Sequence, residues 1–80
     1  MNKDDILRLI KNYLHSEVID PGVQLNSNSK FTELGMDSFS IINLILTLES
    51  QTGISLVENG IRADDIETID SLTNFVLSRT

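Results

Sequence analysis

The chain has 80 residues, no cysteine and a formal net charge of -6, and 40% of its residues are hydrophobic. This length allows one domain over residues 1–80, and the lack of cysteine excludes a disulfide framework or a thiolate metal site. The acidic balance argues against nucleic acid and anionic membranes as partners, because both need a basic footprint. No apolar run is long enough to span a membrane, and the first residues lack the pattern of a secretion or transit signal, so we expect a cytoplasmic protein.

Residues 3–16 are predicted to form the first helix. Asn2 is a capping residue type, and two aspartates follow it in the first turn, where the helix dipole favours negative charge. Apolar side chains recur at helical spacing and predict a buried face made of Ile6, Leu9, Ile10 and Tyr13, which Leu7 and Leu14 widen. His15 is the only histidine. With no second ligand type near it, we expect an exposed residue at the helix end, without a metal or catalytic role.

Helical periodicity is absent from residues 16–30, which hold a Pro21-Gly22 turn and a polar stretch at 26–29. Such a long connection needs apolar anchors in a compact domain. The candidate anchors are Val18, Ile19, Val23 and Leu25. Phe31 and Leu34 then lead the chain back into the core.

The most apolar helix is predicted over residues 38–52, ending at Gly53. One stripe at i, i+3, i+4 and i+7 predicts a buried face of Ile41, Leu44, Ile45 and Leu48. A second apolar stripe lies on a different face and consists of Phe39, Ile42 and Leu46. One small core cannot easily bury both stripes. The second is therefore either a further internal contact, in a fully wrapped helix, or an exposed docking surface.

The apolar segment 54–57 has strand propensity, but no second strand is available to pair with it. Residues 61–66 are too few for a stable isolated helix and predict one or two packed turns. The last helix should begin near Thr68, Asp70 or Ser71 and end near Ser78, with Ile69, Leu72, Phe75 and Val76 on its apolar side. The expected fold is all-α: a bundle of three to four helices with a long first loop and a short third helix.

The sequence contains no credible arrangement of catalytic residues. The sequence holds no credible Ser-His-Asp set, no phosphate-binding glycine loop and no zinc or calcium spacing. The acidic pairs Asp4-Asp5 and Asp64-Asp65 are interpreted as solvated helix starts. We therefore expect a protein that is not an enzyme and that presents a group, namely the hydroxyl of Ser38 at the positive end of a helix.

The segment Leu34-Gly35-Met36-Asp37-Ser38-Phe39 resembles the Leu-Gly-x-Asp-Ser-Leu signature of acyl carrier proteins and related thiolation domains. The resemblance continues through Gly53-Ile54 and through residues 65–76, so it covers most of the chain. It implies that Ser38 is esterified by 4′-phosphopantetheine, whose thiol holds a substrate as a thioester. It also implies that Asp37 helps a transferase to place its metal and cofactor at the serine.

The resemblance implies partners as well. These are a phosphopantetheinyl transferase and enzymes that load or process the acyl group, such as a ligase, synthase or transferase. The surface that they would recognise is made of Phe39, Ile42, Asn43 and Leu46. A carrier that leaves each enzyme in turn needs only a small, transient interface, and we expect a monomer.

Two features bear on the kind of carrier. Peptidyl carriers usually have a second glycine where this chain has Met36, which favours an acyl carrier. Carriers of primary fatty-acid synthesis have several acids along the recognition helix, whereas this helix has Asn43, Thr47 and Ser50 at its outer positions. We therefore expect docking through apolar contact, and a discrete carrier in a specialised polyketide, peptide or modified-acyl pathway. The alternatives are a peptidyl carrier, a D-alanyl carrier, or an unmodified acidic helical adaptor that uses the same stripe.

Overall fold

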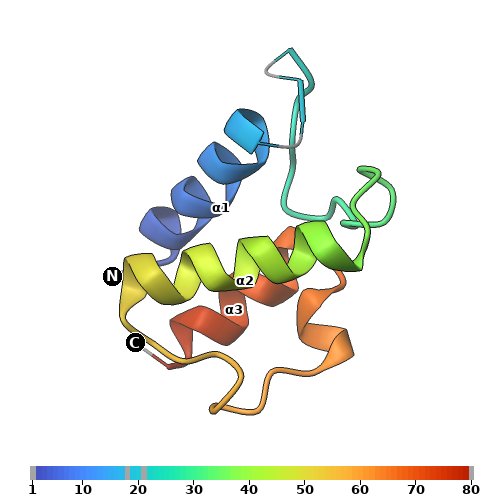
Figure 1. The fold of residues 1–80 in the computed structure, drawn as a ribbon. Helices are drawn as coiled ribbons and strands as arrows, with labels where there is room; N and C mark the ends of the chain where they lie inside the picture. The colour runs from blue at the N-terminus through green and yellow to red at the C-terminus, as the bar shows by residue number, and fades with distance from the viewer. Residues whose placement is uncertain (1, 18, 21, 80) are drawn as a thin grey trace.

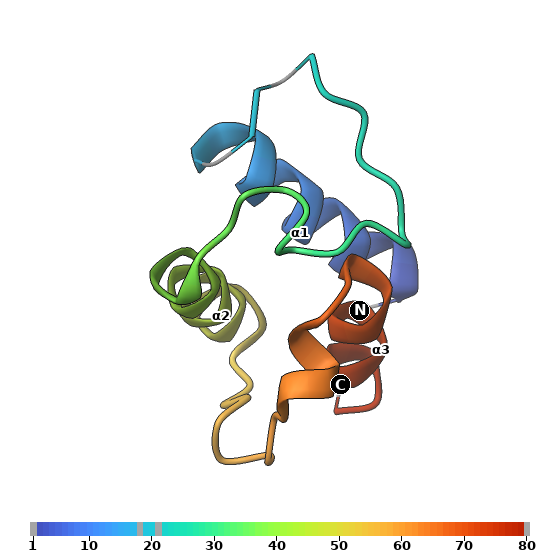
Figure 2. The ribbon, with the colours of Figure 1, turned by 90° about the vertical axis from the view of Figure 1, so that its right-hand side faces the viewer.

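The computed structural model describes residues 2–17, 19–20 and 22–79, and this part of the chain contains helices and no strand. The elements are α1 (Lys3–Glu17), α2 (Ser38–Thr52), the short 3-10 helix η1 (Ala63–Ile66) and α3 (Ile69–Leu77). Figure 1 shows the long first loop between α1 and α2, and the view along α2 in Figure 2 shows α1 and α3 on one side of that helix. The predicted all-α bundle with a short third helix is confirmed.

The core is built from one face of each helix together with loop residues. The predicted apolar side of α3 is buried along its length, and Leu44 and Leu48 of α2 are buried, while Ile41 and Ile45 pack at the edge of the core. In α1 the fully buried residues are Ile6, Ile10 and Leu14, while Leu9 and Tyr13 are half-buried and pack against the core. The other side of α2 faces solvent, because α1 and α3 both lie on one side of this helix (Figure 2).

The first loop has apolar anchors, but not all those predicted. Ile19 and Leu25 are buried, which confirms two of them. The prediction for Val23 is wrong, because its side chain is 45% exposed in the turn where its N–H donates to Asp20 O. Val18 lies outside the described residues. Ile19 and Leu25 therefore anchor the loop to the core.

The exposure predicted for His15 is also wrong. Its ring is half-buried, and its Nδ1 is buried without a hydrogen-bond partner among the described residues. The chain folds back at this helix end, where the Ile19 N–H donates to Leu14 O at 2.6 Å, so the ring is partly covered. Across the described part of the chain, no three His, Cys, Asp or Glu residues are grouped as metal ligands.

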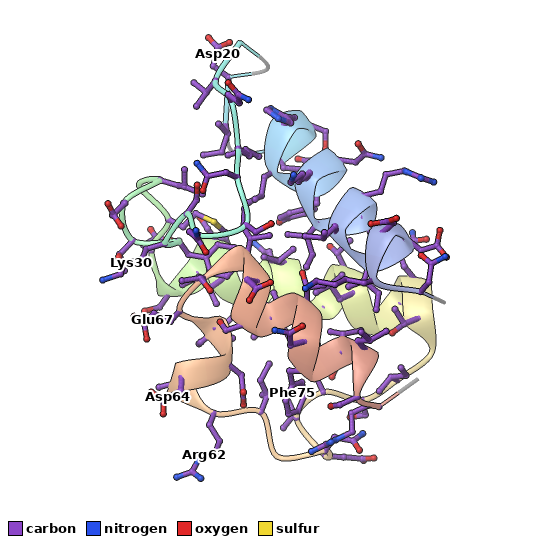
Figure 3. The ribbon with its side chains drawn as sticks, turned by 180° about the vertical axis from the view of Figure 1, so that it is seen from behind. Asp20, Lys30, Arg62, Asp64, Glu67 and Phe75 are labelled. Carbon is purple, nitrogen blue, oxygen red and sulfur yellow. The ribbon has the colours of Figure 1, made fainter. Side chains whose placement is uncertain are left out.

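The end of the first loop caps the start of α3. The first N–H groups of a helix have no partner inside it. Here the Ile69 N–H donates to Ser29 O at 3.2 Å, and the Asp70 N–H donates to Ser27 O at 2.9 Å. Lys30 and Glu67 lie side by side at this junction (Figure 3), with Nζ and Oε1 3.9 Å apart. Both charges are half-exposed, so this ion pair stabilises the junction less than the backbone hydrogen bonds do.

The connection after α2 is held by a side chain of the helix itself. Gly53 ends α2 with a left-handed φ of 73°, as its position predicts. The Glu49 carboxylate then accepts from the Leu56 N–H at 2.8 Å and from the Val57 N–H at 3.4 Å. This contact directs Leu56 into the core and leaves Val57 68% exposed. Residues 56–60 form a turn, and the segment 54–57 contains no strand, as predicted.

Thr68→Ala should lower the free energy of unfolding by about 1 kcal/mol. Thr68 Oγ1 accepts from the Ser71 N–H and Ser71 Oγ accepts from the Thr68 N–H, both at 3.0 Å, so the substitution removes half of a reciprocal cap. Urea unfolding followed by circular dichroism measures the change. The control is Thr32→Ala, at an exposed threonine with no side-chain hydrogen bond in the described structure. Equal midpoints for the two variants would contradict this role of the cap.

Candidate functional site

A tight turn before α2 places Asp37 and Ser38 at the surface. The N–H groups of Leu34 and Met36 both donate to Phe31 O at 3.1 Å, and Gly35 adopts a φ of 82° that favours glycine. Phe31 is fully buried and Met36 is 5% exposed, so the two ends of the turn are held in the core. The two residues that follow Met36 are exposed at the start of the helix.

Ser38 is the first residue of α2, as the sequence predicts. Its side chain is exposed, and its hydroxyl makes no hydrogen bond with any residue that the structure describes. The free N–H groups of the first helical turn give this end of α2 a partial positive charge. An anion attached to Ser38 would therefore lie in a favourable electrostatic environment.

Asp37 is the N-cap of α2. It has an extended backbone, with φ -96° and ψ -178°, and its Oδ1 accepts from the Ser40 N–H at 2.9 Å. The hydrogen bond from the Ser40 backbone, followed by that from the Ser40 side chain, lowers the pKa of the Asp37 carboxyl below its ordinary value. A carboxylate with a lowered pKa is a weak base, so Asp37 is poorly suited to activate the neighbouring hydroxyl.

The Asp37 cap should weaken in acid. Because its folded-state pKa is lowered, the stability it contributes is present above the ordinary carboxyl pKa and is lost as the pH falls through the lowered folded value. An NMR titration of the Asp37 carboxyl carbon should give a midpoint below 3.8, the ordinary value. Asp37→Asn keeps an oxygen that can cap and should remove this part of the acid sensitivity. A midpoint at or above 3.8 would show that the cap is not formed in solution.

The second apolar stripe of α2 is exposed, which excludes a fully wrapped helix. Phe39 is 72% exposed, Ile42 54% and Leu46 55%, and Asn43 beside them is half-buried. Between Asp37 and Glu49 this helix has no charged residue, and the Glu49 carboxylate already binds backbone N–H groups of the next turn. The four predicted docking residues therefore share an uncharged surface beside Ser38. We call Phe39, Ile42, Asn43 and Leu46 the docking surface.

Sequence reasoning missed the residues of α1 that lie opposite this surface. Tyr13 and Glu17 line a groove together with Asn43 and Leu46. The spacing of Tyr13 predicted a core position, and Glu17 gave no signal at all. Contacts between two helices depend on how the helices pack, which a periodic pattern within one helix does not contain.

The chain matches the phosphopantetheine attachment site family over residues 4–76. It belongs to this family of carrier proteins. Phosphopantetheine is the cofactor of the family, which confirms the cofactor expected from the resemblance. Members are carrier domains and not enzymes, so the prediction that this domain is not an enzyme is confirmed as well.

Relatives of this carrier domain include plant acyl carrier proteins. It is 28% identical over 75 residues to acyl carrier protein 2, mitochondrial, of Arabidopsis thaliana, a match that covers 94% of this chain and 56% of the relative. It is 29% identical over 73 residues to acyl carrier protein 1, chloroplastic, of Hordeum vulgare, and this match covers 91% of this chain and 46% of the relative. The chain thus spans about half the length of these relatives.

The fold also matches a solved structure. That structure is the Bradyrhizobium japonicum glycine:carrier protein ligase complexed with its cognate carrier protein and an analogue of glycyl adenylate. The match has a TM-score of 0.73 and 18% identity, and it covers 95% of this chain and 96% of the other. The likeness supports the carrier fold. Among the described residues, no helix combines the length and the apolar character needed to cross a bilayer.

Proposed function

We propose that this chain is an acyl carrier protein in which the Ser38 hydroxyl carries 4′-phosphopantetheine, and that residues 1–80 form a single carrier domain. The observation that supports the proposal most is the position of Ser38. It is an exposed hydroxyl with no internal hydrogen bond, at the first residue of a helix, in a chain of this family. When bound, the group supplies a thiol that holds an acyl intermediate as a thioester.

The residues at this site fit the group. A phosphodiester on Ser38 adds about one negative charge, which the N-terminus of α2 favours. Within the described residues the hydroxyl is not committed to another contact, so its modification breaks no hydrogen bond. Because the Asp37 carboxylate accepts the capping hydrogen bond from the Ser40 N–H and is weakly basic, it is poorly suited to remove the proton of Ser38. We infer that a phosphopantetheinyl transferase supplies the base, and Asp37 would then assist by placing the metal and cofactor of that enzyme.

The docking surface supports the proposal that partner enzymes recognise α2. Its apolar side chains are more than half exposed next to Ser38, where an enzyme must approach to reach the tethered group. The carrier in the structural neighbour is bound to a glycine:carrier protein ligase. We propose that a ligase of this general kind, together with synthases or transferases, acts on the loaded form of this chain as a monomer.

The pathway is also part of the proposal. An uncharged docking surface differs from the acidic recognition helix typical of fatty-acid synthesis, which favours a specialised polyketide, peptide or modified-acyl pathway. A peptidyl or D-alanyl carrier is the alternative within the same chemistry. A cytoplasmic location stays a prediction, since the plant relatives are mitochondrial and chloroplastic proteins.

Intact-mass spectrometry tests the attachment site. Incubation of the chain with coenzyme A and a broad-specificity phosphopantetheinyl transferase should add one phosphopantetheine to all of the protein. Ser38→Ala should abolish the gain in mass completely, because it removes the acceptor oxygen. Ser40→Ala is the matched control in the same helical turn and should retain it. No gain in the wild-type chain would overturn the proposal and favour an unmodified acidic adaptor, whereas a gain that survives in Ser38→Ala would place the group elsewhere.

A further inference from the structure

A surface groove runs along the outer face of α1 and borders α2 at one end. One part of it, of about 460 Å³, is lined among others by Leu9, Asn12, Tyr13 and Glu17 of α1 and by Thr47 and Gln51 of α2. A second part, of about 240 Å³, shares Leu9 and Asn12 and extends along α1 to Arg8 and Asp5. We call these two parts together the α1 groove.

The α1 groove lies on the side of α2 that is turned away from Ser38. Thr47 follows Ser38 by nine residues, which places it roughly 180° around the helix at about 100° per residue. No residue of the docking surface lines either part of the groove, although a neighbouring hollow connects it to Asn43 and Leu46. A segment bound in the α1 groove would therefore leave Ser38 uncovered and would reach only the edge of the docking surface.

The middle of the α1 groove has the composition of a protein interface. Leu9 and Tyr13 lie one turn apart on the same face of α1, and both are half-buried. Between Arg8 and Glu17, none of the described charged side chains lines the groove. Interfaces are depleted of charged residues at their centre and enriched in tyrosine. Burial, and to a smaller extent Glu17, raise the pKa of the Tyr13 phenol, so its hydroxyl stays protonated at neutral pH and can donate to a partner.

The two ends of the groove have accessible charges of opposite sign. Glu17 is exposed in the last turn of α1, where the helix dipole disfavours a carboxylate, and it forms no ion pair with any residue that the structure describes. At the other end, the Arg8 side chain is 70% exposed and its guanidinium lies 4.0 Å from the Asp5 carboxylate, which also accepts from the Asn2 N–H. A complementary partner therefore needs a basic group at one end and an acidic group at the other.

We propose that the α1 groove binds an amphipathic helix of a partner protein, with apolar side chains on Leu9 and Tyr13, a basic side chain beside Glu17 and an acidic one beside Arg8. The groove is roughly 18 Å long from Asp5 to Glu17 at about 1.5 Å per residue, which is the length of about twelve helical residues. Helices bind grooves of this kind through one apolar face.

The position of the groove gives such a partner a role. Because the groove faces away from Ser38, the partner can hold the chain while a second enzyme acts at Ser38. This consequence rests on the proposed attachment at Ser38, whereas the binding itself does not.

NMR titration of the unmodified, ¹⁵N-labelled chain with a synthetic helix tests the proposal. The probe is a capped, alanine-based peptide of about eighteen residues, long enough to be helical in water, with leucines at i, i+4 and i+7. It has a glutamate in its first turn and an arginine about nine residues later, to match the spacing of Arg8 and Glu17. We expect amide shifts that saturate with an apparent Kd of about 1 mM or below, largest at Leu9, Tyr13 and Gln51. Shifts confined to the docking surface, or shifts that do not saturate, overturn the proposal.

Charge reversal separates binding in the groove from general attraction to an acidic chain. Glu17→Lys should weaken binding of the peptide about fivefold. A second peptide, with glutamate in place of the arginine, should show the opposite preference. Glu33→Lys makes the same change in net charge at an exposed glutamate of the turn before α2, and it should leave both affinities within about twofold of the wild type. Equal changes in the two variants would overturn the ion pair at Glu17.

The mass assay keeps this proposal apart from the proposed function. A saturating concentration of the peptide should leave the rate of phosphopantetheine transfer to Ser38 within about twofold, because the groove faces away from that residue. Transfer that the bound peptide blocks would overturn the separation of the α1 groove from the docking surface. Absence of a mass gain without the peptide would overturn the proposed function and leave the binding result standing.

Discussion

Phe31→Ala should lower the free energy of unfolding by about 3–5 kcal/mol. The ring is fully buried, and the backbone of the same residue joins two parts of the fold. Its N–H donates to Glu67 O before α3, and its carbonyl accepts from Leu34 and Met36 in the turn that leads to Ser38. Since small domains have a total stability of about 5–15 kcal/mol, the loss is a large part of the whole. Urea unfolding followed by circular dichroism measures it.

The chain contains a matched control for this substitution. Phe39→Ala makes the same chemical change at a ring that is 72% exposed, so its stability should stay within about 0.5 kcal/mol of the wild type. Similar losses in the two variants would contradict the placement of one ring in the core and the other at the surface.

Phe39→Ala and Leu46→Ala should each raise the apparent KM of the phosphopantetheinyl transferase for this chain about tenfold, without loss of stability. Side chains of this kind contribute about 1–3 kcal/mol when a partner buries them. The assay follows transfer from coenzyme A at varied concentrations of the unmodified chain. Val23→Ala is the control, because Val23 is 45% exposed on the first loop, away from the docking surface.

The same interaction should depend weakly on salt. Raising the ionic strength from about 0.1 M to about 1 M shortens the Debye length from about 10 Å to about 3 Å and screens exposed ion pairs. The docking surface has no charge, and Glu49 is engaged inside the molecule, so we expect the apparent KM to change by less than about threefold. A steep loss of affinity with salt, with Phe39→Ala and Leu46→Ala both neutral, would show that docking depends on charge.

The helix boundaries could be predicted because local chemistry sets them. Asp37 caps α2 through its own carboxylate, Gly53 ends the helix with a positive φ, and Thr68 caps α3 through its hydroxyl. Each of these signals acts within three or four residues of the helix end, so the residue types there are sufficient to predict the boundary. The spacing of the apolar residues likewise predicted the buried face of α2, but it left open whether the second stripe is exposed, which the structure decides.

The predictions that were wrong, and the features that were not predicted, concern contacts between distant segments. The exposure of Val23 and the partial burial of His15 depend on how the first loop folds back over the end of α1. The capping of Ile69 by Ser29 needs a backbone carbonyl from forty residues away, which no residue type specifies. Backbone groups are the same at every position, so sequence patterns do not indicate which of them will meet.

The amino-acid order therefore determines where α2 begins, that it starts with a free hydroxyl, and that an apolar stripe follows it. These features arise from caps, glycine and helical periodicity, all of which act over a few residues. The packing of α1 against α2 adds what the order does not contain: a groove between these two helices, lined by Tyr13 of α1 and Asn43 of α2 among others. The physical reason is that the groove exists only between two helices, and its shape depends on the core residues that set their separation and angle.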